Sequence, residues 1–372
     1  MTTAAPDELH SELLSRIRMG PGTAMDDGEF DRLARAVFAH QYSCNQPYRL
    51  FCDRRGVAPD SVAHWGEIPA VPTDAFKAAA LVCGDPGAEM AAVFRTSGTT
   101  AGPERRGTHH VPDLALYDAA LRAGFAAHLL PDGARPRVLS LVPPPSALPD
   151  SSLSHMAGAV MADFGGEGGG WFVTPDGGID HQGLGDALRA AAGDGEPVCI
   201  LGTAFAFVHW LDALRESGTR HHLPAGSRLM DTGGFKGRSR EVTREELYEG
   251  FDELLGIPYA WCVNEYGMTE LGSQFYDGVA GAALAPSERL HVGPAWVRTQ
   301  ATDPETLKPL PHGETGVLRH VDLANLHSVA AIQTADLGIT SPEGFRVLGR
   351  ARGAEARGCS IAMDDLLSAI GR

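Results

Sequence analysis

The sequence predicts an α/β fold, followed by a small antiparallel β subdomain. Short apolar runs that resemble buried strands alternate with amphipathic helical patterns between about residues 137 and 272. This alternation is typical of a sheet covered by helices on its faces. After about residue 286 the pattern changes to strands joined by turns, in "ERLHVGPAWVRTQ", "GETGVLRHVDL", "AIQTADLGIT" and "FRVLGRARG". In α/β sheets, ligands bind beyond the carboxyl ends of the strands.

The elements follow in order from the amino terminus. Residues 7–18 and 26–42 place apolar side chains at helical spacing, with acids in the first turn, so both segments predict helices. Prolines break "IPAVPTDAF" into extended chain. "AAVFRT" predicts a strand that enters a Gly/Thr-rich loop, and residues 113–129 predict a helix that leaves it.

Four buried strands are expected in the middle of the chain, in "RVLSLVPP", "PVCILGTAF", "SRLMDTGG" and "YAWCVNEYG". Helices are expected over residues 183–193, 206–218 and 239–256. The last of these begins at Ser239 or Thr243, and Glu246 completes a capping box with Thr243. We therefore expect an α/β core over 1–286 with a helical N-terminal segment, a β subdomain over 287–350 and a short tail over 351–372. The tail is too short to fold alone, so it packs on the body or stays mobile.

Composition excludes several classes of protein. The hydrophobic content of 43% with 21% charged residues is that of a globular protein, and the net charge of −16 argues against a nucleic-acid partner. No signal-peptide pattern and no membrane-span pattern is visible, so we expect a cytoplasmic protein. The six Cys show no CxxC pair or zinc-type spacing, which predicts free thiols in a reducing compartment.

The stretch "RTSGTTAGPERRG" carries the ingredients of an anion site. Glycines let the backbone approach a phosphate, hydroxyl groups and successive amides can bind it, and Arg105 and Arg106 can neutralise its charge. The stretch is not a Walker loop, because no Lys follows the second Gly. A solvated surface turn fits the residue types equally well.

Four further segments carry weaker signals. "NEYGMTELG" brings together an aromatic ring, a hydroxyl and a carboxylate that could contact a base, a phosphate and a cation, although a simple strand-to-turn transition fits too. In "DTGGFKGRSR" the glycines could lie against a flat ring, and Asp336 in "TADLG" could bind ribose hydroxyls. The closing "LGRARGAEARGCS" places a Cys among arginines.

In this order the segments resemble the adenylate-forming superfamily of acyl-CoA synthetases, peptide-synthetase adenylation domains and luciferases. "IPAVPTDAFK", "GGFKGRSR" and "GAEARGCS" are most similar to the LuxE-type acyl-protein synthetase family. The resemblance implies helix-flanked mixed sheets plus the small antiparallel β subdomain, with the superfamily's C-terminal domain largely absent. It also implies that ATP and Mg²⁺ are the cofactors.

The resemblance implies a role for each matching residue. Thr269 would contact the α-phosphate, Glu270 would hold Mg²⁺, and Arg350 would approach the phosphate or ribose. The remaining nucleotide contacts would come from Thr96, Ser97, Gly98, Thr99, Thr100, Arg105 and Arg106 on the phosphates, Gly233, Gly234, Phe235, Tyr266 and Gly267 on the adenine, and Asp336 on the ribose. The loop departs from the superfamily pattern, because its Gly is shifted and Arg stands where Lys is usual.

Cys359 is, by the same resemblance, the residue that receives the acyl group before a partner reductase takes it. Arg352 and Arg357 are expected to lower the pKa of its thiol. The acyl pocket is expected around His155, Phe205, His209 and Gly234, although either His is more often a core residue than a catalyst.

Three hypotheses follow for function. The first is an ATP-dependent enzyme that activates a carboxylic acid, fatty by resemblance, and acylates its own Cys359 or a partner protein. The second is a freestanding ligase that passes the acyl group directly to a small-molecule nucleophile or carrier protein. The third, from another class, is a catalytically retired nucleotide-binding protein, against which the joint presence of Thr99, Glu270, Asp336 and Arg350 argues.

Overall fold

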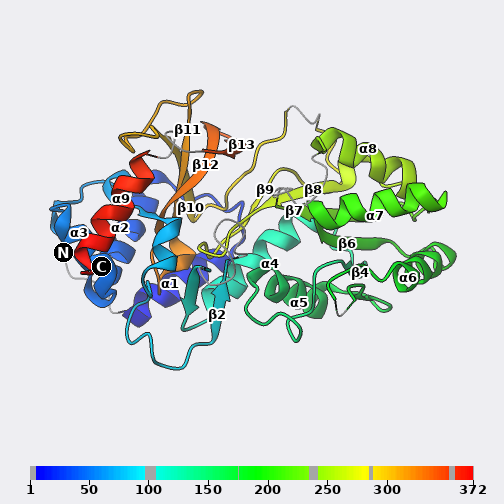
Figure 1. The fold of residues 1–372 in the computed structure, drawn as a ribbon, viewed down its shortest axis with the longest axis horizontal. Helices are drawn as coiled ribbons and strands as arrows, with labels where there is room; N and C mark the ends of the chain where they lie inside the picture. Colours follow the sequence, from blue (N-terminus) through cyan, green and yellow to red (C-terminus); the bar gives the residue numbers. More distant parts are fainter. Residues whose placement is uncertain are drawn as a thin grey trace. The chain divides into compact units, whose positions relative to one another are not determined.

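The computed structural model describes residues 6–96, 106–174, 176–233, 242–284, 288–351 and 357–371. The chain forms two compact units, each built from separate stretches of sequence (Figure 1). The first unit comprises Met1–Ala123, Met268–Gln274 and Val292–Arg372, and the second comprises Gly124–Gly267 and Phe275–His291. This grouping differs from the consecutive segments 1–286, 287–350 and 351–372, because the N-terminal helices pack with the C-terminal strands. Those boundaries stay a prediction.

Three helices open the first unit: α1 (Pro6–Arg18), α2 (Asp27–Cys44) and α3 (Gln46–Arg54). The Asp26 side chain caps α2 by accepting a hydrogen bond from the Glu29 backbone amide. The Asn45 side chain caps α3 by accepting one from the Tyr48 backbone amide. The apolar stripes read from the sequence face the core, where Leu13 and Phe30 are fully buried. The two helices expected at the amino terminus are confirmed.

The main sheet of the first unit joins five strands in the order β1, β12, β11, β10, with β13 beside β12. Their bounds are β1 (Val71–Pro72), β10 (Val297–Thr302), β11 (Thr315–Asp322), β12 (Ala331–Ser341) and β13 (Gly344–Arg350). The pairs among β10 to β13 are antiparallel, which confirms the expected β arrangement there. β1 adds in parallel from the Pro-broken segment near residue 70.

A separate hairpin pairs β2 (Ala92–Arg95) with β3 (Thr108–Val111). β2 is the strand expected before the Gly/Thr-rich loop, whereas β3 was not foreseen. Short 3₁₀ helices complete the first unit: η1 (Pro59–Ser61), η2 (Trp65–Glu67), η3 (Thr73–Lys77) and η7 (Leu323–Asn325).

The described end of the tail forms α9 (Arg357–Ala369) and packs on the first unit (Figure 1). Ala362 and Leu366 are fully buried, and Asp365 forms an ion pair at 3.0 Å with Arg55, the residue directly after α3. Gly358 donates its amide to the Pro304 carbonyl at 2.7 Å. Of the two expectations for the tail, packing on the body is the one observed for these residues.

The second unit holds a sheet in the order β5, β4, β6, β7, β8, β9, parallel except for the last pair. Its strands are β4 (Arg137–Ser140), β5 (Gly170–Trp171), β6 (Val198–Thr203), β7 (Arg228–Thr232), β8 (Cys262–Tyr266) and β9 (Phe275–Tyr276). Its helices are α4 (Ala115–Leu129), which begins in the first unit, α5 (Ser152–Phe164), α6 (His181–Asp194), α7 (Ala204–Ser217), α8 (Arg244–Leu255) and η5 (Tyr259–Trp261). The expected α/β alternation is confirmed.

Successive strand residues point to opposite faces of this sheet, which sorts the helices into two layers. Ile200 and Leu229 belong to the core packed against α6, α7 and α8, whereas Leu201 and Met230 belong to the core packed against α4 and α5. The capping box of α8 is present, with Thr243 at its N-cap. Ser239, the alternative cap, lies outside the described residues.

The cysteines do not all remain free thiols, which corrects the sequence-based expectation. Cys44 and Cys83 form a disulfide, with Cα atoms 4.7 Å apart. The cause is tertiary: the end of α2 and the segment after η3 meet, and the Gly84 amide donates to the Cys44 carbonyl at 3.0 Å. Cys52 is buried in the core as expected, and so are Cys199 and Cys262. In the part of the chain that the structure describes, no helix is long and apolar enough to cross a membrane.

Candidate active site

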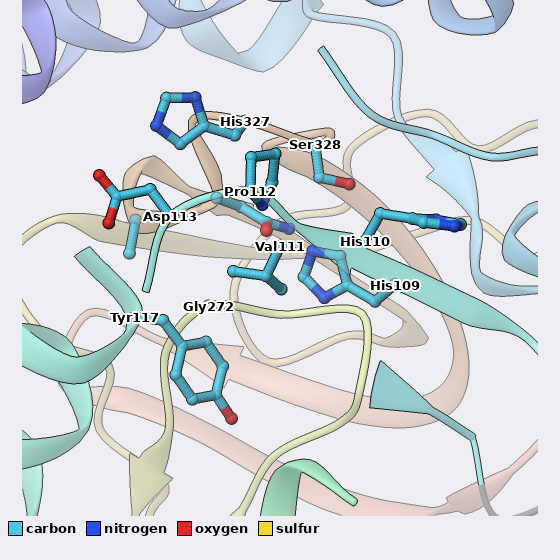
Figure 2. A pocket seen from close by; sticks show the side chains of 11 residues that line it. His109, His110, Val111, Pro112, Asp113, Tyr117, Gly272, His327 and Ser328 are labelled. Atoms are coloured by element: carbon cyan, nitrogen blue, oxygen red, sulfur yellow. The ribbon is translucent and has the colours of Figure 1, made fainter. Parts of the chain in front are cut away.

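Glu270 lies in the first unit on a short segment, Met268–Gln274, whose backbone is held from two sides. The His109 ring donates through Nδ1 to the Thr269 carbonyl at 2.7 Å, and the side-chain amide of Asn325 donates to the Glu270 carbonyl at 2.8 Å. Asp322 accepts the Gly272 amide at 2.9 Å. Figure 2 shows His109 and Gly272 lining one small pocket beside this segment.

The Glu270 side chain is buried, and burial raises the pKa of its carboxyl to about 7. Its own backbone amide lowers the pKa, as do the positive charges of Arg350 and Lys77, whereas the negative charge of Asp74 raises it. A buried carboxylate with this incomplete compensation gains from a bound cation. The site therefore has the chemistry of a hard-metal ligand.

Asp336 and Arg350 face each other across β12 and β13, where they are register partners. The Arg350 Nε donates to the Asp336 carboxylate at 3.0 Å. The Asp336 side chain is mostly buried, whereas 61% of the Arg350 side chain is exposed. The pair thus presents a cationic group to solvent while its carboxylate is fixed in the sheet. Since Arg350 also acts on Glu270, the structure brings three of the expected residues together.

The two described ends of the Gly/Thr-rich loop meet at the base of the β2–β3 hairpin. The Thr96 hydroxyl accepts the Gly107 amide at 2.9 Å, and the Arg106 guanidinium donates to the carbonyls of Thr96 and Arg95. Arg106 therefore binds backbone at this base. The other expected phosphate contacts, Ser97, Gly98, Thr99, Thr100 and Arg105, lie outside the described residues.

Lys77 and Asp74 also act electrostatically on Glu270, and their roles were not foreseen from the sequence. Both lie on η3, where the Lys77 Nζ donates to the Asp74 carboxylate at 2.6 Å. The signal was available, because "IPAVPTDAFK" was among the segments that carried the family resemblance. His109 and Asn325 gave no comparable signal, since each acts through a backbone carbonyl far away in sequence.

Cys359 is the third residue of α9 and is partly buried beside β12. Its thiol lies 3.5 Å from the Thr334 carbonyl, to which it donates. Burial raises the pKa of the thiol to about 11, and the negative charge of Asp74 acts in the same direction. This corrects the expectation that neighbouring arginines lower it: Arg357 is exposed, and Arg352 lies outside the described residues. Asp74 acts electrostatically on both Glu270 and Cys359.

In the second unit, the expected adenine-side residues follow neighbouring parallel strands. Thr232 of β7 pairs with Glu265 of β8, so Gly233 and Tyr266 come next to each other at the carboxyl edge of the sheet. The Tyr266 ring packs against the rings of Phe275 and His291, with 5.8 Å and 5.7 Å between ring centroids.

Two glycines at this edge have conformational reasons to be glycine. Gly233 has a φ of 73°, which disfavours other residues. A Cβ atom at Gly267 would come within 2.2 Å of the Glu265 carboxylate. Gly234 and Phe235, also expected on the adenine, lie outside the described residues.

The expected acyl-pocket residues begin helices at the same edge. Phe205 is the second residue of α7, which directly follows β6. Its ring contacts the ring of His209, one helical turn later, with 4.5 Å between ring centroids. His209 is exposed and Phe205 half-buried. His155 lies half-buried in the first turn of α5, on the opposite face of the sheet. Their joint role in an acyl pocket stays a prediction.

A buried polar network fixes the strands beneath this edge. Asp231 accepts hydrogen bonds from Tyr248 at 2.6 Å and from Asn264 at 2.7 Å. Arg244 forms an ion pair with Asp277 at 2.8 Å and donates to the side-chain Oδ1 atom of Asn264 at 3.0 Å. We call these five residues the Asp231 network. Every carboxylate in it has a donor within hydrogen-bond distance.

Comparison with known proteins places this geometry in a family. A family model described as "Acyl-protein synthetase, LuxE" matches residues 171–368, more than half of the chain. The chain belongs to the LuxE acyl-protein synthetase family. The matched region of this LuxE-family protein contains the Thr269–Glu270 segment, the Asp336–Arg350 pair and Cys359.

Two curated relatives of the LuxE-family chain are described as long-chain-fatty-acid–luciferin-component ligases. The chain is 24% identical to the one from Vibrio harveyi over 370 residues, covering 91% of this chain and 88% of that one. It is also 24% identical to the one from Aliivibrio fischeri over 358 residues, with the same shares covered. The protein is accordingly a ligase of the acyl-protein synthetase type.

Solved structures of adenylate-forming enzymes share the fold. An open conformation of 2-hydroxyisobutyryl-CoA ligase gives a TM-score of 0.61 at 17% identity, over 90% of this chain and 77% of that one. ATP-bound MatB from Rhodopseudomonas palustris gives 0.50 at 18% identity, over 72% of this chain. The match spans 50% of the MatB chain. These similarities confirm the adenylate-forming fold expected from the sequence.

Proposed function

We propose that the protein uses ATP and Mg²⁺ to convert a carboxylic acid, of the fatty-acid class, to an acyl adenylate, and that the acyl group then passes to Cys359 or to a partner protein. The observation that carries this proposal is the buried Glu270 carboxylate beside Arg350, which itself pairs with Asp336. The names of the curated relatives support the acid class.

The residues present fit a bound Mg²⁺ ion and a nucleotide. Glu270 is a hard oxygen ligand whose pKa of about 7 leaves it largely ionised at slightly alkaline pH. Mg²⁺ would neutralise negative charge on the phosphates of ATP. Thr269 would contact the α-phosphate, Asp336 would accept hydrogen bonds from the ribose, and Arg350 would approach the phosphate or ribose. The phosphate-loop residues and the adenine-side residues Gly233, Tyr266 and Gly267 keep the roles expected from the sequence.

The first step joins two anions, so charge neutralisation and positioning dominate its barrier. One oxygen of the substrate carboxylate forms a bond to the α-phosphorus of ATP. The bond between that phosphorus and the bridging oxygen breaks, and pyrophosphate leaves with the electron pair. The cationic side chains of Lys77 and Arg350, close to Glu270 in the first unit, support this chemistry.

In the second step the Cys359 sulfur attacks the acyl carbon of the adenylate. The thiol proton leaves to solvent, a thioester bond forms, and AMP departs. The influence of Asp74 on both Cys359 and Glu270 supports a short path between the two sites of reaction. A thiol with a pKa of about 11 is mostly protonated at neutral pH, so this step should be slow there and faster in alkali.

The same raised pKa favours a second candidate, in which the adenylate passes its acyl group directly to another acceptor. The acceptor would be a reductase, a carrier protein or a small-molecule nucleophile. Either route fits an enzyme that works in the cytoplasm.

Both routes are tested by incubating the protein with ATP, Mg²⁺ and a series of fatty and short-chain acids. We expect acid-dependent release of pyrophosphate, and an intact mass increased by one acyl group. The Cys359→Ala variant should keep pyrophosphate release and lose the adduct. Absence of pyrophosphate with every acid would contradict the proposed function.

A matched control separates a specific thiol from general loss of structure. Cys52→Ala removes a buried thiol of the same unit and should leave both readouts unchanged. If the adduct persists in Cys359→Ala, the acceptor is another residue. If adenylation proceeds without any adduct in the unmodified protein, direct transfer is the correct route.

A further inference from the structure

A second polar cluster lies in the first unit and has no part in the proposed reaction. It gathers side chains from five segments that are distant in sequence. It consists of two groups, His40 and Cys44 of α2 with Cys83 after η3, and His10 of α1 with Asp113 before α4 and His327 after η7, and the potential ligand atoms within each group lie within 4.8 Å of one another. Metal ligands of this mixed kind, imidazole and thiolate, are those that zinc prefers.

The first group within the cluster is His40, Cys44 and Cys83. Their ligand atoms all lie within 4.8 Å of one another. The His40 Nε2 atom is 3.5 Å from the Cys44 sulfur, one helical turn further along α2. Zinc bonds of about 2.3 Å to sulfur and about 2.1 Å to nitrogen, set at a tetrahedral angle, separate the two ligand atoms by about 3.6 Å. The helix alone therefore presents two ligands at the spacing of one zinc ion.

The third ligand, Cys83, is held beside His327 by a backbone hydrogen bond. The Cys83 amide donates to the His327 carbonyl at 2.8 Å, so both residues approach α2 together. The ring of His327 meets that of His40 edge to face, with 6.3 Å between centroids. His327 is thus the neighbouring residue that can supply a fourth ligand.

A short polar chain orients the His327 ring. Its Nε2 atom lies 3.3 Å from Nδ1 of His10, and Nε2 of His10 lies 3.7 Å from the Asp113 carboxylate. Figure 2 shows His327 and Asp113 together at one end of the pocket, with His109 towards the other. The contact through Nε2 leaves Nδ1 as the coordinating atom. Such outer partners fix the orientation of ring ligands in metal sites.

We propose that this cluster is a structural zinc site when Cys44 and Cys83 are reduced, with His40, Cys44, Cys83 and His327 as ligands and His10 and Asp113 orienting His327. The structure holds the oxidised form, in which the two sulfurs are bonded to each other. A thiol reductant such as glutathione supplies two electrons and two protons to break that bond. Zinc binding then releases both thiol protons as the thiolates coordinate.

The bound ion would link α2 to the segments that carry Cys83 and His327. These segments also support the active-site side of the unit, since Ser328 donates to the Leu81 carbonyl at 2.6 Å and Asn325 holds the Glu270 carbonyl. Zinc should therefore stabilise the first unit without taking part in the reaction. Apart from His40 and Cys44, which are one helical turn apart, the ligands lie far apart in sequence, which is why no zinc-type spacing is visible.

The test uses the full-length protein, reduced with a phosphine under anaerobic conditions, with its free thiols counted. Co²⁺ is then titrated in as a spectroscopic substitute for zinc. We expect one Co²⁺ per chain, absorption bands of tetrahedral Co²⁺, and a sulfur-to-cobalt charge-transfer band that added Zn²⁺ removes. The charge-transfer band should weaken in Cys44→Ser and in Cys83→Ser, disappear when both substitutions are combined, and persist in the control Cys52→Ala.

His10→Ala tests the orienting role, with an expected loss of about 10- to 100-fold in Co²⁺ affinity while the charge-transfer band is retained. X-ray absorption of the zinc-loaded, unmutated protein avoids any effect of substitutions on folding. Two sulfur neighbours at about 2.3 Å and two nitrogen neighbours at about 2.0–2.1 Å would support the site. Reduced protein with Cys44 and Cys83 free that gives no charge-transfer band would overturn it.

Discussion

Both units contain buried carboxylates near expected site residues, but these carboxylates differ in the hydrogen-bond donors that balance the cost of burying their charge. In the second unit, each carboxylate of the Asp231 network accepts hydrogen bonds from Arg, Asn or Tyr side chains. In the first unit, Glu270 has only its own backbone amide as a hydrogen-bond donor among the described residues, and Arg350 and Lys77 act on it through space. Burial raises the pKa of Glu270 to about 7, and it also raises the pKa of Asp231 and of Asp277, so the two regions differ in their hydrogen-bond donors.

This difference separates a structural role from a functional one. A network in which every buried acceptor has a donor stabilises the positions of the strands and needs no ligand. A buried carboxylate without a matched donor is a place where a cation adds favourable energy. We therefore expect changes in the Asp231 network to affect folding first, and changes around Glu270 to affect activity first.

The largest effect should come from Glu270→Gln. The amide keeps the shape of the side chain but cannot supply the negative charge that a magnesium ion requires. We expect pyrophosphate release to fall by about 10²- to 10³-fold, as when a single electrostatic contact to the transition state is lost. Stability should be unchanged or slightly increased, because a buried charge is removed.

The control for this variant is Glu253→Gln, on the exposed surface of α8, where Glu253 pairs with Arg220. It removes the same charge from an exposed position of the second unit and should leave pyrophosphate release unchanged. Equal activity of Glu270→Gln and the unmodified protein would remove Glu270 from the reaction.

Two arginine variants sharpen the comparison by giving opposite readouts. Arg244→Ala leaves the buried Asp277 with one donor fewer and removes a positive charge that acts on Asp231, so we expect a loss of about 3 kcal/mol in the free energy of unfolding. Arg350→Ala removes a mostly exposed side chain, so stability should change by less than about 1 kcal/mol while adenylation slows. Urea denaturation and pyrophosphate release measure the two effects. If Arg350→Ala lost stability and Arg244→Ala lost only activity, the comparison between the two regions would be wrong.

The pH dependence of Mg²⁺ binding is the third test. Because the pKa of Glu270 is raised from 4.5 to about 7, its proton must leave before a cation can bind. Without Mg²⁺, the raised pKa makes the native state less stable as pH rises between these two values. With Mg²⁺, the ion affinity should rise about tenfold per pH unit below pH 7 and level off above it. The shift of the melting temperature on addition of Mg²⁺ measures this affinity at each pH. In Glu270→Gln the shift should no longer depend on pH.

The smallest effect should come from Gly358→Ala. A Cβ atom at residue 358 would lie 2.7 Å from the Pro304 carbonyl oxygen, so the start of α9 must shift and Cys359 with it. We expect acylation of Cys359 to slow by about tenfold and pyrophosphate release to stay the same. Ser368→Ala, at an exposed position of the same helix, is the matched control. Unchanged acylation in Gly358→Ala would show that the placement of this turn is unimportant.

Much of the fold could be predicted because local patterns agreed with the tertiary structure. The strand–helix alternation of the second unit and the capping box at Thr243 were both visible in the sequence. β3 was missed, since a four-residue strand directly after a loop has little periodicity to detect. The boundaries at residues 286 and 350 stay predictions, whereas the two compact units are each assembled from separate stretches of chain, which local sequence patterns do not reveal.

The candidate site was predictable where a motif carried it and not where space alone did. Glu270, Asp336 and Arg350 belong to recognisable segments, and the structure brings them together. His109 and Asn325 bind backbone carbonyls, an interaction that leaves no residue pattern. The raised pKa of Cys359 could not be foreseen, because it comes from burial beside β12 and from the negative charge of Asp74, which is far away in sequence.

The most direct test of the central claim is acid-dependent exchange of labelled pyrophosphate into ATP, because this exchange requires reversible formation of an acyl adenylate. We expect exchange with a fatty acid in the presence of Mg²⁺, persistence of exchange in Cys359→Ala, and its loss in Glu270→Gln. The absence of exchange with every acid, from folded protein that binds ATP, would contradict the assignment of this site as an acyl-adenylating centre.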